Sequence, residues 1–316
     1  MRNYADRCNL HARIHALRGR LLSLRDYAFL VKERAPDFSH IFDAQEPSRA
    51  RQTLFREQIA PLIGLVEAYE RYTPLFLAFL RHYEAQNAKV LLANAFGKQS
   101  LSCWYDISPF AILDEELLRK KLSLDEVKSL LAGTYLAPDL KDASSYPQMV
   151  LRVEISTALH LYRASLSLPA QAQKEFQDVM LRRIGLLALI WSRRLRKYYH
   201  WSDERILLYR EDLHDRFGGH AWSRVREEER ALNSYLERVH KSRGTEPSLV
   251  DIERHLDRKY YAWVSSMFHR DFHSLYCVLA YLWLVFYQIK NLFCIIDGKR
   301  FNFSPNEILN RIICGT

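Results

Sequence analysis

Apolar residues recur every three or four positions along most of the chain, which is the spacing of one face of an α-helix. The first example is an arginine-flanked stripe formed by Leu10, Ile14, Leu17 and Leu21. The same periodicity predicts further helices over residues 53–68, 74–95, 114–131, 149–166, 171–199, 223–241, 249–269 and 272–296. Two stretches rich in proline and polar residues predict a loop or broken helix over 35–51 and a linker over 138–147.

One long apolar run near the end of the chain stands out in this pattern. It reads C-V-L-A-Y-L-W-L-V-F-Y from Cys277 and has no polar stripe; the polar residues 297–300 then predict a break before a new helix begins at Ser304. Residues 272–289 carry no formal charge, but their strictly apolar part is shorter than the ~20 residues that a membrane-spanning helix needs. We therefore predict a buried core helix.

An acid or amide three residues before an asparagine recurs on the long helices. The two pairs are Glu84 with Asn87 and Gln288 with Asn291. Because residues three apart lie on one helix face, each pair is expected to act together. The long helix predicted between them, over 171–199, has Arg183 and Leu186 at the corresponding positions. Its copy of the pair is therefore degenerate. A single acid beside an asparagine is more typical of bonding within a helix bundle than of catalysis, so we expect these four polar residues to be structural.

Serine followed by acidic residues predicts a helix start at four places, because the serine oxygen accepts from a free backbone N–H and acids suit a helix N-terminus. The four serines are Ser23, Ser123, Ser202 and Ser304. A second element, V-D-I-E-R-H-L-D-R-K-Y-Y, repeats the V-L-R-V-E-I-S-T-A-L-H-L-Y upstream. Both elements recur at ~100 residues, which indicates internal repeats. We therefore divide the chain into three helical repeats over 1–110, 111–217 and 218–316.

Composition agrees with an all-α fold. Among 316 residues, 48% are hydrophobic and 26% charged, with only 10 Gly and 10 Pro, so short sheets joined by tight turns are not expected. The 5 cysteines are an odd number without C-x-x-C spacing and are expected to be buried thiols. Buried thiols suit a reducing compartment, so we expect a cytoplasmic protein, and the opening residues contain no apolar core of a signal peptide.

The formal net charge of +9 is compatible with nucleic acid, anionic lipid or an acidic protein surface as a partner. The densest basic run is Arg193, Arg194, Arg196 and Lys197, at the predicted end of a long helix. Cations at that position suit the helix dipole, so the run is either a solvated helix end or a surface that binds a partner.

No motif for chemistry is found. The sequence contains neither a phosphate-binding P-loop, nor a G-x-G-x-x-G fingerprint after a strand, nor H-E-x-x-H, so we expect no catalytic residue and no cofactor. His11 with His15 and His269 with His273 are spaced by four residues and share a helix face. A metal site would need two further ligands, and we predict no metal at either pair.

Taken together, the repeated motifs resemble the C-subunit family of the bacterial and archaeal V-type (A-type) ATPases, whose eukaryotic counterpart is the d protein of the membrane sector. The segments that carry the resemblance are the opening Y-A-D-R-C-N-L-H-A-R-I-H-A-L-R, then H-Y-E-A-Q-N-A-K, D-I-E-R-H-L-D-R-K-Y-Y, and Q-I-K-N-L-F-C-I-I before S-P-N-E-I. Together they cover nearly the whole chain. This sequence departs from the family at Gln288, where a glutamate is usual, and at Arg183 and Leu186.

The resemblance implies a funnel of three similar helical bundles around a pseudo-threefold axis. Such a protein caps the proteolipid rotor ring, receives the foot of the central shaft formed by the D and F subunits, and transmits torque during proton or sodium transport without catalysing a reaction. It is peripheral on the cytoplasmic side of the membrane sector and does not span the membrane.

Two alternatives remain open from the residues alone. A basic helical-repeat protein that binds nucleic acid would carry a basic stripe on the same helix of each repeat, yet the dense cluster follows only the second one. An integral membrane protein would depend on residues 272–289 alone. We therefore expect no nucleic acid partner and no spanning segment.

Overall fold

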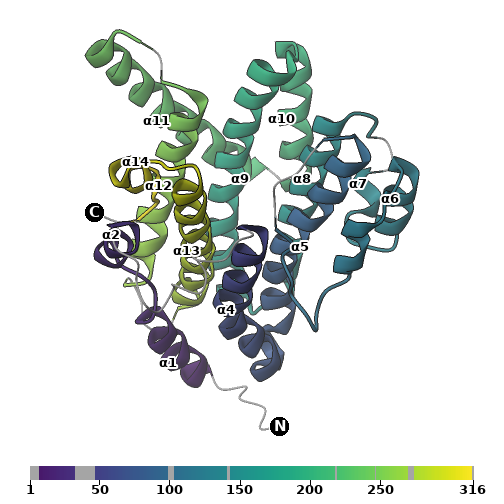
Figure 1. Cartoon of the computed structure of the whole chain (residues 1–316), viewed down its shortest axis with the longest axis vertical. Helices are drawn as coiled ribbons and strands as arrows, with labels where there is room; N and C mark the ends of the chain where they lie inside the picture. Colours follow the sequence, from purple (N-terminus) through teal and green to yellow (C-terminus); the bar gives the residue numbers. More distant parts are fainter. Residues whose placement is uncertain are drawn as a thin grey trace.

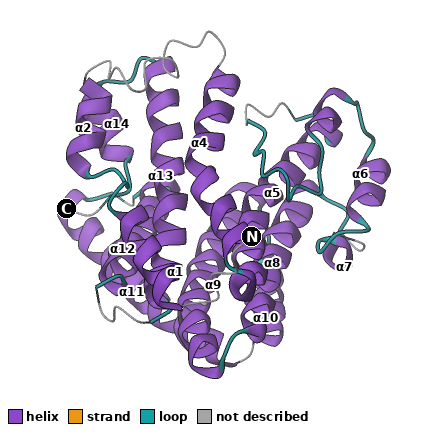
Figure 2. Ribbon diagram, turned by 90° about the horizontal axis from the view of Figure 1, so that it is seen from below, coloured by secondary structure: helices purple, strands orange, loops and turns teal. Residues whose placement is uncertain are grey.

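The computed structural model describes residues 7–32, 47–98, 103–140, 143–217, 219–245, 247–269 and 274–314. Regular structure in these residues is helical and none of it is strand, which confirms the all-α prediction (Figure 2). The α-helices are α1 (Arg7–Arg18), α2 (Leu24–Lys32), α4 (Pro47–Ala68), α5 (Thr73–Ala95), α6 (Leu124–Leu131), α7 (Ala137–Leu140), α8 (Tyr146–Ala164), α9 (Ala170–Tyr199), α10 (Asp203–Phe217), α11 (Gly219–Arg243), α12 (Leu249–Met267), α13 (Tyr276–Arg300) and α14 (Pro305–Arg311).

Three helix pairs form the body of the molecule: α4 with α5, α8 with α9, and α12 with α13 (Figure 1). The second helix of each pair also packs against the first helix of another pair, as α5 on α8, α9 on α12, and α13 on α4. We call these three contacts the seams. Because the third seam joins the last pair to the first, the packing closes into a cycle.

Helix α13 lies at the centre of the core. It packs against α1, α4, α9 and α12, and residues such as Trp283 and Tyr287 are 2% and 0% exposed. Its length and composition would suffice to cross a membrane, but 78% of its most apolar window is buried inside the fold. An all-round apolar helix is stable in water only when neighbouring helices cover it, as they do here.

The break predicted over 297–300 is wrong, because α13 continues to Arg300. Gly298 lies against the side chain of Ile308 on α14, and the Asp297 carboxylate pairs with Arg51 on α4. The polar residues therefore serve contacts with neighbouring helices. The loop or broken helix was predicted over 35–51 and the next helix from residue 53, but α4 already begins at Pro47; residues 35–46 lie outside the described residues.

All four predicted helix starts carry serine caps. Ser123 and Ser304 form complete capping boxes, in which each hydroxyl accepts from the backbone N–H three residues on, at 3.3 Å. The Ser23 backbone N–H donates to Asp26 at 2.7 Å, and the Ser202 hydroxyl accepts from the Arg205 N–H at 3.3 Å. These bonds satisfy backbone donors that would otherwise lack partners in the first turn.

Helices from the two ends of the chain share one core. Tyr27 and Leu30 of α2 lie in an apolar cluster with Ile308 of α14, and α1 packs on α13. Figure 1 shows α1 and α2 on the side of the molecule where α12, α13 and α14 lie. The boundaries 1–110, 111–217 and 218–316 stay predictions, and the first and last segments are joined by extensive packing.

Candidate functional site

Asn87 and Asn291 bind backbone in the same way. The Asn87 amide donates to the Tyr105 carbonyl at 2.9 Å and accepts from the Tyr105 N–H at 2.8 Å. Asn291 makes the same two bonds with Ile313, at 2.7 and 2.8 Å. Both asparagines are almost fully buried, at 1% and 2% exposed. Each therefore holds the segment that follows its helix.

Glu84 and Gln288 also bind backbone rather than facing a cavity. The Glu84 carboxylate accepts from the N–H groups of Ile112 and Leu113, the latter at 2.9 Å, and from Arg81 at 2.7 Å. The Gln288 carbonyl oxygen accepts from the Leu22 N–H at 2.7 Å. The repeated acid-or-amide motif thus holds backbone of the segments that connect the helices.

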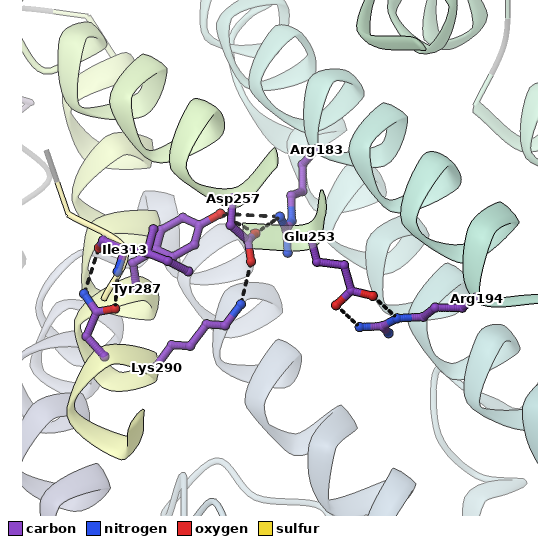
Figure 3. Close-up of polar contacts among 8 residues, drawn as sticks. Arg183, Arg194, Glu253, Asp257, Tyr287, Lys290 and Ile313 are labelled. Carbon is purple, nitrogen blue, oxygen red and sulfur yellow. Dashed lines mark hydrogen bonds and ion pairs between the residues drawn. The ribbon is translucent and has the colours of Figure 1, made fainter. Parts of the chain in front are cut away.

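Arg183, at the degenerate copy of this motif, enters a buried charged network (Figure 3). Its guanidinium donates to Asp257 at 3.1 Å, and the same carboxylate accepts from the Tyr287 hydroxyl at 3.0 Å and from Lys290 at 2.5 Å. Burial alone would raise the pKa of Asp257, but the charges of Lys290 and Arg183 outweigh it and lower that pKa below its ordinary value. The network joins α9, α12 and α13.

An ion pair other than this network crosses each seam. The pairs are Lys89 with Glu154 at 3.0 Å, Arg194 with Glu253 at 2.6 Å, and Asp297 with Arg51. In the first two seams the cation is on the second helix of a pair, α5 or α9. In the α13–α4 seam the polarity is reversed, with the acid on α13. The seam that closes the cycle therefore differs in charge pattern from the other two.

The predicted basic cluster is partly neutralised within the chain. Arg194 binds both oxygens of Glu253, at 2.6 and 2.7 Å (Figure 3), and Arg196 binds Asp203 at 3.0 Å. Arg193 is half-buried and engaged within the chain, whereas Lys197 is exposed. The structure thus does not bring the four residues together as one open basic surface, and their role in binding a partner stays a prediction.

Three adjoining cavities lie among the helix pairs, and Gln86 lines all of them. The central cavity, about 160 Å³, is enclosed by α5, α8, α9 and α13 and lined by His82, Lys89, Glu154, Arg183, Trp283 and Phe286. The mouth depression, about 490 Å³, lies among α5, α8, α9 and α12 and is lined by the first two seam ion pairs together with Tyr198 and Val250. The side pocket, about 420 Å³, lies between α5, α13 and α14.

The charged groups at the central cavity are paired, Lys89 with Glu154 and Arg183 with Asp257. Burial and the cations Arg183 and Lys89 lower the pKa of His82 to about 3, so the imidazole is neutral at physiological pH. Burial would raise the pKa of Glu154, but Lys89 and the Trp191 N–H outweigh it and lower that pKa. The carboxylate therefore stays ionised, and the cavity shows no carboxyl group with a raised pKa of the kind that general acid catalysis requires.

No metal cluster is found in the described ranges, where no group of three His, Cys, Asp or Glu residues could hold a metal ion. His11 bonds to the Ser274 carbonyl at 2.9 Å, and the His15 ring packs edge-on against Phe268. His273 lies outside the described residues, so the second histidine pair cannot be placed as a pair.

The mouth depression includes two residues that the motif search missed. Tyr198, near the end of α9, is 55% exposed, and Val250, in the first turn of α12, is 57% exposed. The first two residues after the Ser248 cap, Leu249 and Val250, are both apolar, and only the structure shows that Leu249 is buried and Val250 exposed. The two residues add exposed apolar surface to a depression that is lined by both charged and apolar side chains.

These features define, within the described residues, an all-helical protein with a closed cycle of helix pairs and an open, partly apolar depression of about 490 Å³. A family model described as "ATP synthase (C/AC39) subunit" matches residues 10–311. The chain therefore belongs to this family of V/A-type ATPase subunits, which confirms the expected membership. No curated protein matches the sequence.

Proposed function

We propose that the chain is a non-catalytic central-stalk component of a rotary V/A-type ATPase. In this role it links the central shaft, formed by the D and F subunits, to the proteolipid ring, and transmits torque during proton or sodium transport. Family membership supports the assignment to the complex. The observation that carries the specific role is the mouth depression, with exposed apolar residues beside internally paired charges.

The foot of the shaft is the proposed occupant of the mouth depression. Exposed apolar and aromatic side chains in a concave surface are typical of the centre of a protein interface, where a few residues supply most of the binding energy. Tyr198 and Val250 have this character. The adjacent Lys89–Glu154 and Arg194–Glu253 pairs supply polar groups, as an interface rim does.

The proteolipid ring is proposed to bind the opposite end of the helix pairs. The Leu275 N–H donates to Glu175 at 2.6 Å, so the starts of α9 and α13 lie together. Glu175 and Tyr198 are on one helix, which puts the mouth residue roughly 35 Å from that end at ~1.5 Å per residue. Leu166, in the turn before α9, is 57% exposed there and would face the ring. The chain itself is peripheral, on the cytoplasmic side.

Torque transmission requires a stiff body, and the closed cycle of seams would supply it. Close-packed helices have low compressibility, so a twist applied at the mouth reaches the other end with little deformation. The seam ion pairs and the Asp257 network add polar links between the helix pairs. In this proposal the three helix pairs belong to three similar bundles, with repeats over 1–110, 111–217 and 218–316. The bundles form a pseudo-threefold funnel, and the seams join one bundle to the next.

Two surface substitutions test the role of the mouth. Tyr198→Ser and Val250→Ser, combined, should weaken binding of the purified shaft subcomplex by ~10-fold or more, measured by calorimetry, because truncated interface anchors have effects of that size. Leu207→Ser on α10 is the matched control, since Leu207 is 52% exposed but does not line the depression. Equal weakening by the control, or none by the double variant, would contradict the assignment.

A further inference from the structure

Tyr83 on α5 lines the side pocket and has an unusual hydroxyl group. The residue is 2% exposed, and its hydroxyl oxygen is buried without a hydrogen-bond partner. A buried hydroxyl normally finds a partner, because losing its bonds to water without replacement destabilises the fold. The adjoining cavity of about 420 Å³ gives a partner room to enter beside this hydroxyl.

The third helix pair shows what kind of partner is missing. Tyr287 on α13 is the residue that corresponds to Tyr83, since it precedes Gln288 as Tyr83 precedes Glu84. Its hydroxyl donates to the Asp257 carboxylate of α12 at 3.0 Å. Beside Tyr83, the first pair presents instead the ring of Phe55 on α4, at 5.1 Å between ring centroids. The site at Tyr83 thus lacks the carboxylate that its counterpart has.

The side pocket has walls that suit a long side chain with a negatively charged end. Tyr105, Phe286 and Phe293 make much of its lining apolar. Of its charged residues, Lys290 pairs with Asp257 and Asp297 pairs with Arg51. Arg311 is exposed and lies over the Phe303 ring at 4.1 Å; its charge acts on Glu307 of the same helix, but among the described residues it forms no salt bridge. The pocket therefore has an exposed cation that is open to a further anion.

We infer that the side pocket binds a carboxylate-ended side chain of the shaft element that enters the mouth depression. The carboxylate accepts a hydrogen bond from the Tyr83 hydroxyl and faces Arg311, while its stem lies against the aromatic walls. Gln86 and Tyr105 line both the side pocket and the mouth depression, so an element in the mouth reaches the pocket directly. Because the hydroxyl is shielded, the surrounding rings shift as the side chain enters. This inference rests on the proposed function.

The variant Tyr83→Phe tests the effect of this hydroxyl on shaft binding separately from its effect on the stability of the fold. The variant loses only the orphaned hydroxyl, so its unfolding temperature should equal or exceed that of the wild type. Its affinity for the purified shaft subcomplex should fall by ~10-fold, which is typical of losing a hydrogen bond to a charged group. The matched control is Tyr287→Phe, whose hydroxyl is already bonded: it should unfold at a lower temperature yet bind the shaft with unchanged affinity.

Arg311→Gln provides the second measurement. It should weaken shaft binding and flatten its dependence on salt, because one charge pair is removed from the interface. If the wild-type chain binds the shaft and Tyr83→Phe binds equally well, the side-pocket inference is wrong while the proposed function stands. If Tyr83→Phe unfolds at a lower temperature, its hydroxyl is structural and the inference is again wrong. If the wild-type chain does not bind the shaft, the proposed function itself fails.

Discussion

Replacing Asp257 with asparagine should strongly destabilise the fold. Asp257 is 5% exposed, and its carboxylate bonds to Arg183, Tyr287 and Lys290. Asparagine has nearly the same shape but no charge, so the Arg183 guanidinium, which is 8% exposed, would remain buried without an anion. Breaking a buried ion pair in this way costs ~3–5 kcal/mol of unfolding free energy.

Urea unfolding followed by far-ultraviolet circular dichroism measures this loss. Glu253→Gln is the control, because the Arg194–Glu253 pair is partly exposed, with side chains 34% and 22% accessible, and should contribute only ~1 kcal/mol. The pKa of Asp257 is lowered, so its stabilising effect is present above the ordinary carboxyl pKa and is lost as the pH falls through the lowered value. The difference between wild type and Asp257→Asn should therefore shrink in acid.

The double variant Arg183→Met with Asp257→Asn completes the test. With no buried cation left unpaired, it should recover most of the stability that Asp257→Asn loses, because apolar replacement of a buried pair is often neutral. A loss below ~1 kcal/mol for Asp257→Asn, or no recovery in the double variant, would refute the view that charge pairing in this network holds the three helices together.

Three further variants test other features of the fold. Asn87→Ala should cost about 2–5 kcal/mol in urea unfolding, because it leaves two buried backbone groups without partners; a cost near zero would contradict the backbone role. Gly298→Ala should cost ~1–3 kcal/mol, since its Cβ would lie 2.5 Å from Ile308, while Gly133→Ala, with no atom within 4 Å, should be nearly neutral. His82→Phe should flatten the pH dependence of stability between pH ~6.5 and the folded pKa of about 3. In that window the unfolded histidine binds a proton that the buried one does not. Wild-type stability therefore falls by up to ~1.4 kcal/mol for each unit by which the pH is lowered. An unchanged slope in the variant would show that His82 is not the cause.

Local signals in the sequence were sufficient for most of the long helices and for the serine-capped starts. A serine cap and an apolar stripe act over one or two turns, so positions such as Ser123 and Ser304 could be recognised without knowing the fold. The polar stretch 297–300 was wrongly predicted to break the helix. Its residues contact α4, which is remote in sequence, and α14, which follows after a turn. Tertiary contacts of this kind override local pattern.

The site depended on contacts that no local pattern encodes. The sequence singled out Arg183 only as a departure from the repeated motif. Its partner Asp257 lies on another helix, 74 residues away, and could not be identified from spacing. Glu84 was expected to bond within the bundle, but the backbone it binds, at Leu113, could not be named from spacing alone. The exposure of Tyr198 and the orphaned hydroxyl of Tyr83 are properties of the assembled helix pairs, so only the structure shows them.

Mechanical coupling of shaft to ring is the central claim, and ion transport by reconstituted vesicles tests it most directly. ATPase complexes depleted of this chain and placed in vesicles should hydrolyse ATP without building an ion gradient. Adding the wild-type chain back should restore the gradient, whereas the chain with Tyr198→Ser and Val250→Ser should restore much less. A full gradient in vesicles that lack the chain would contradict the account.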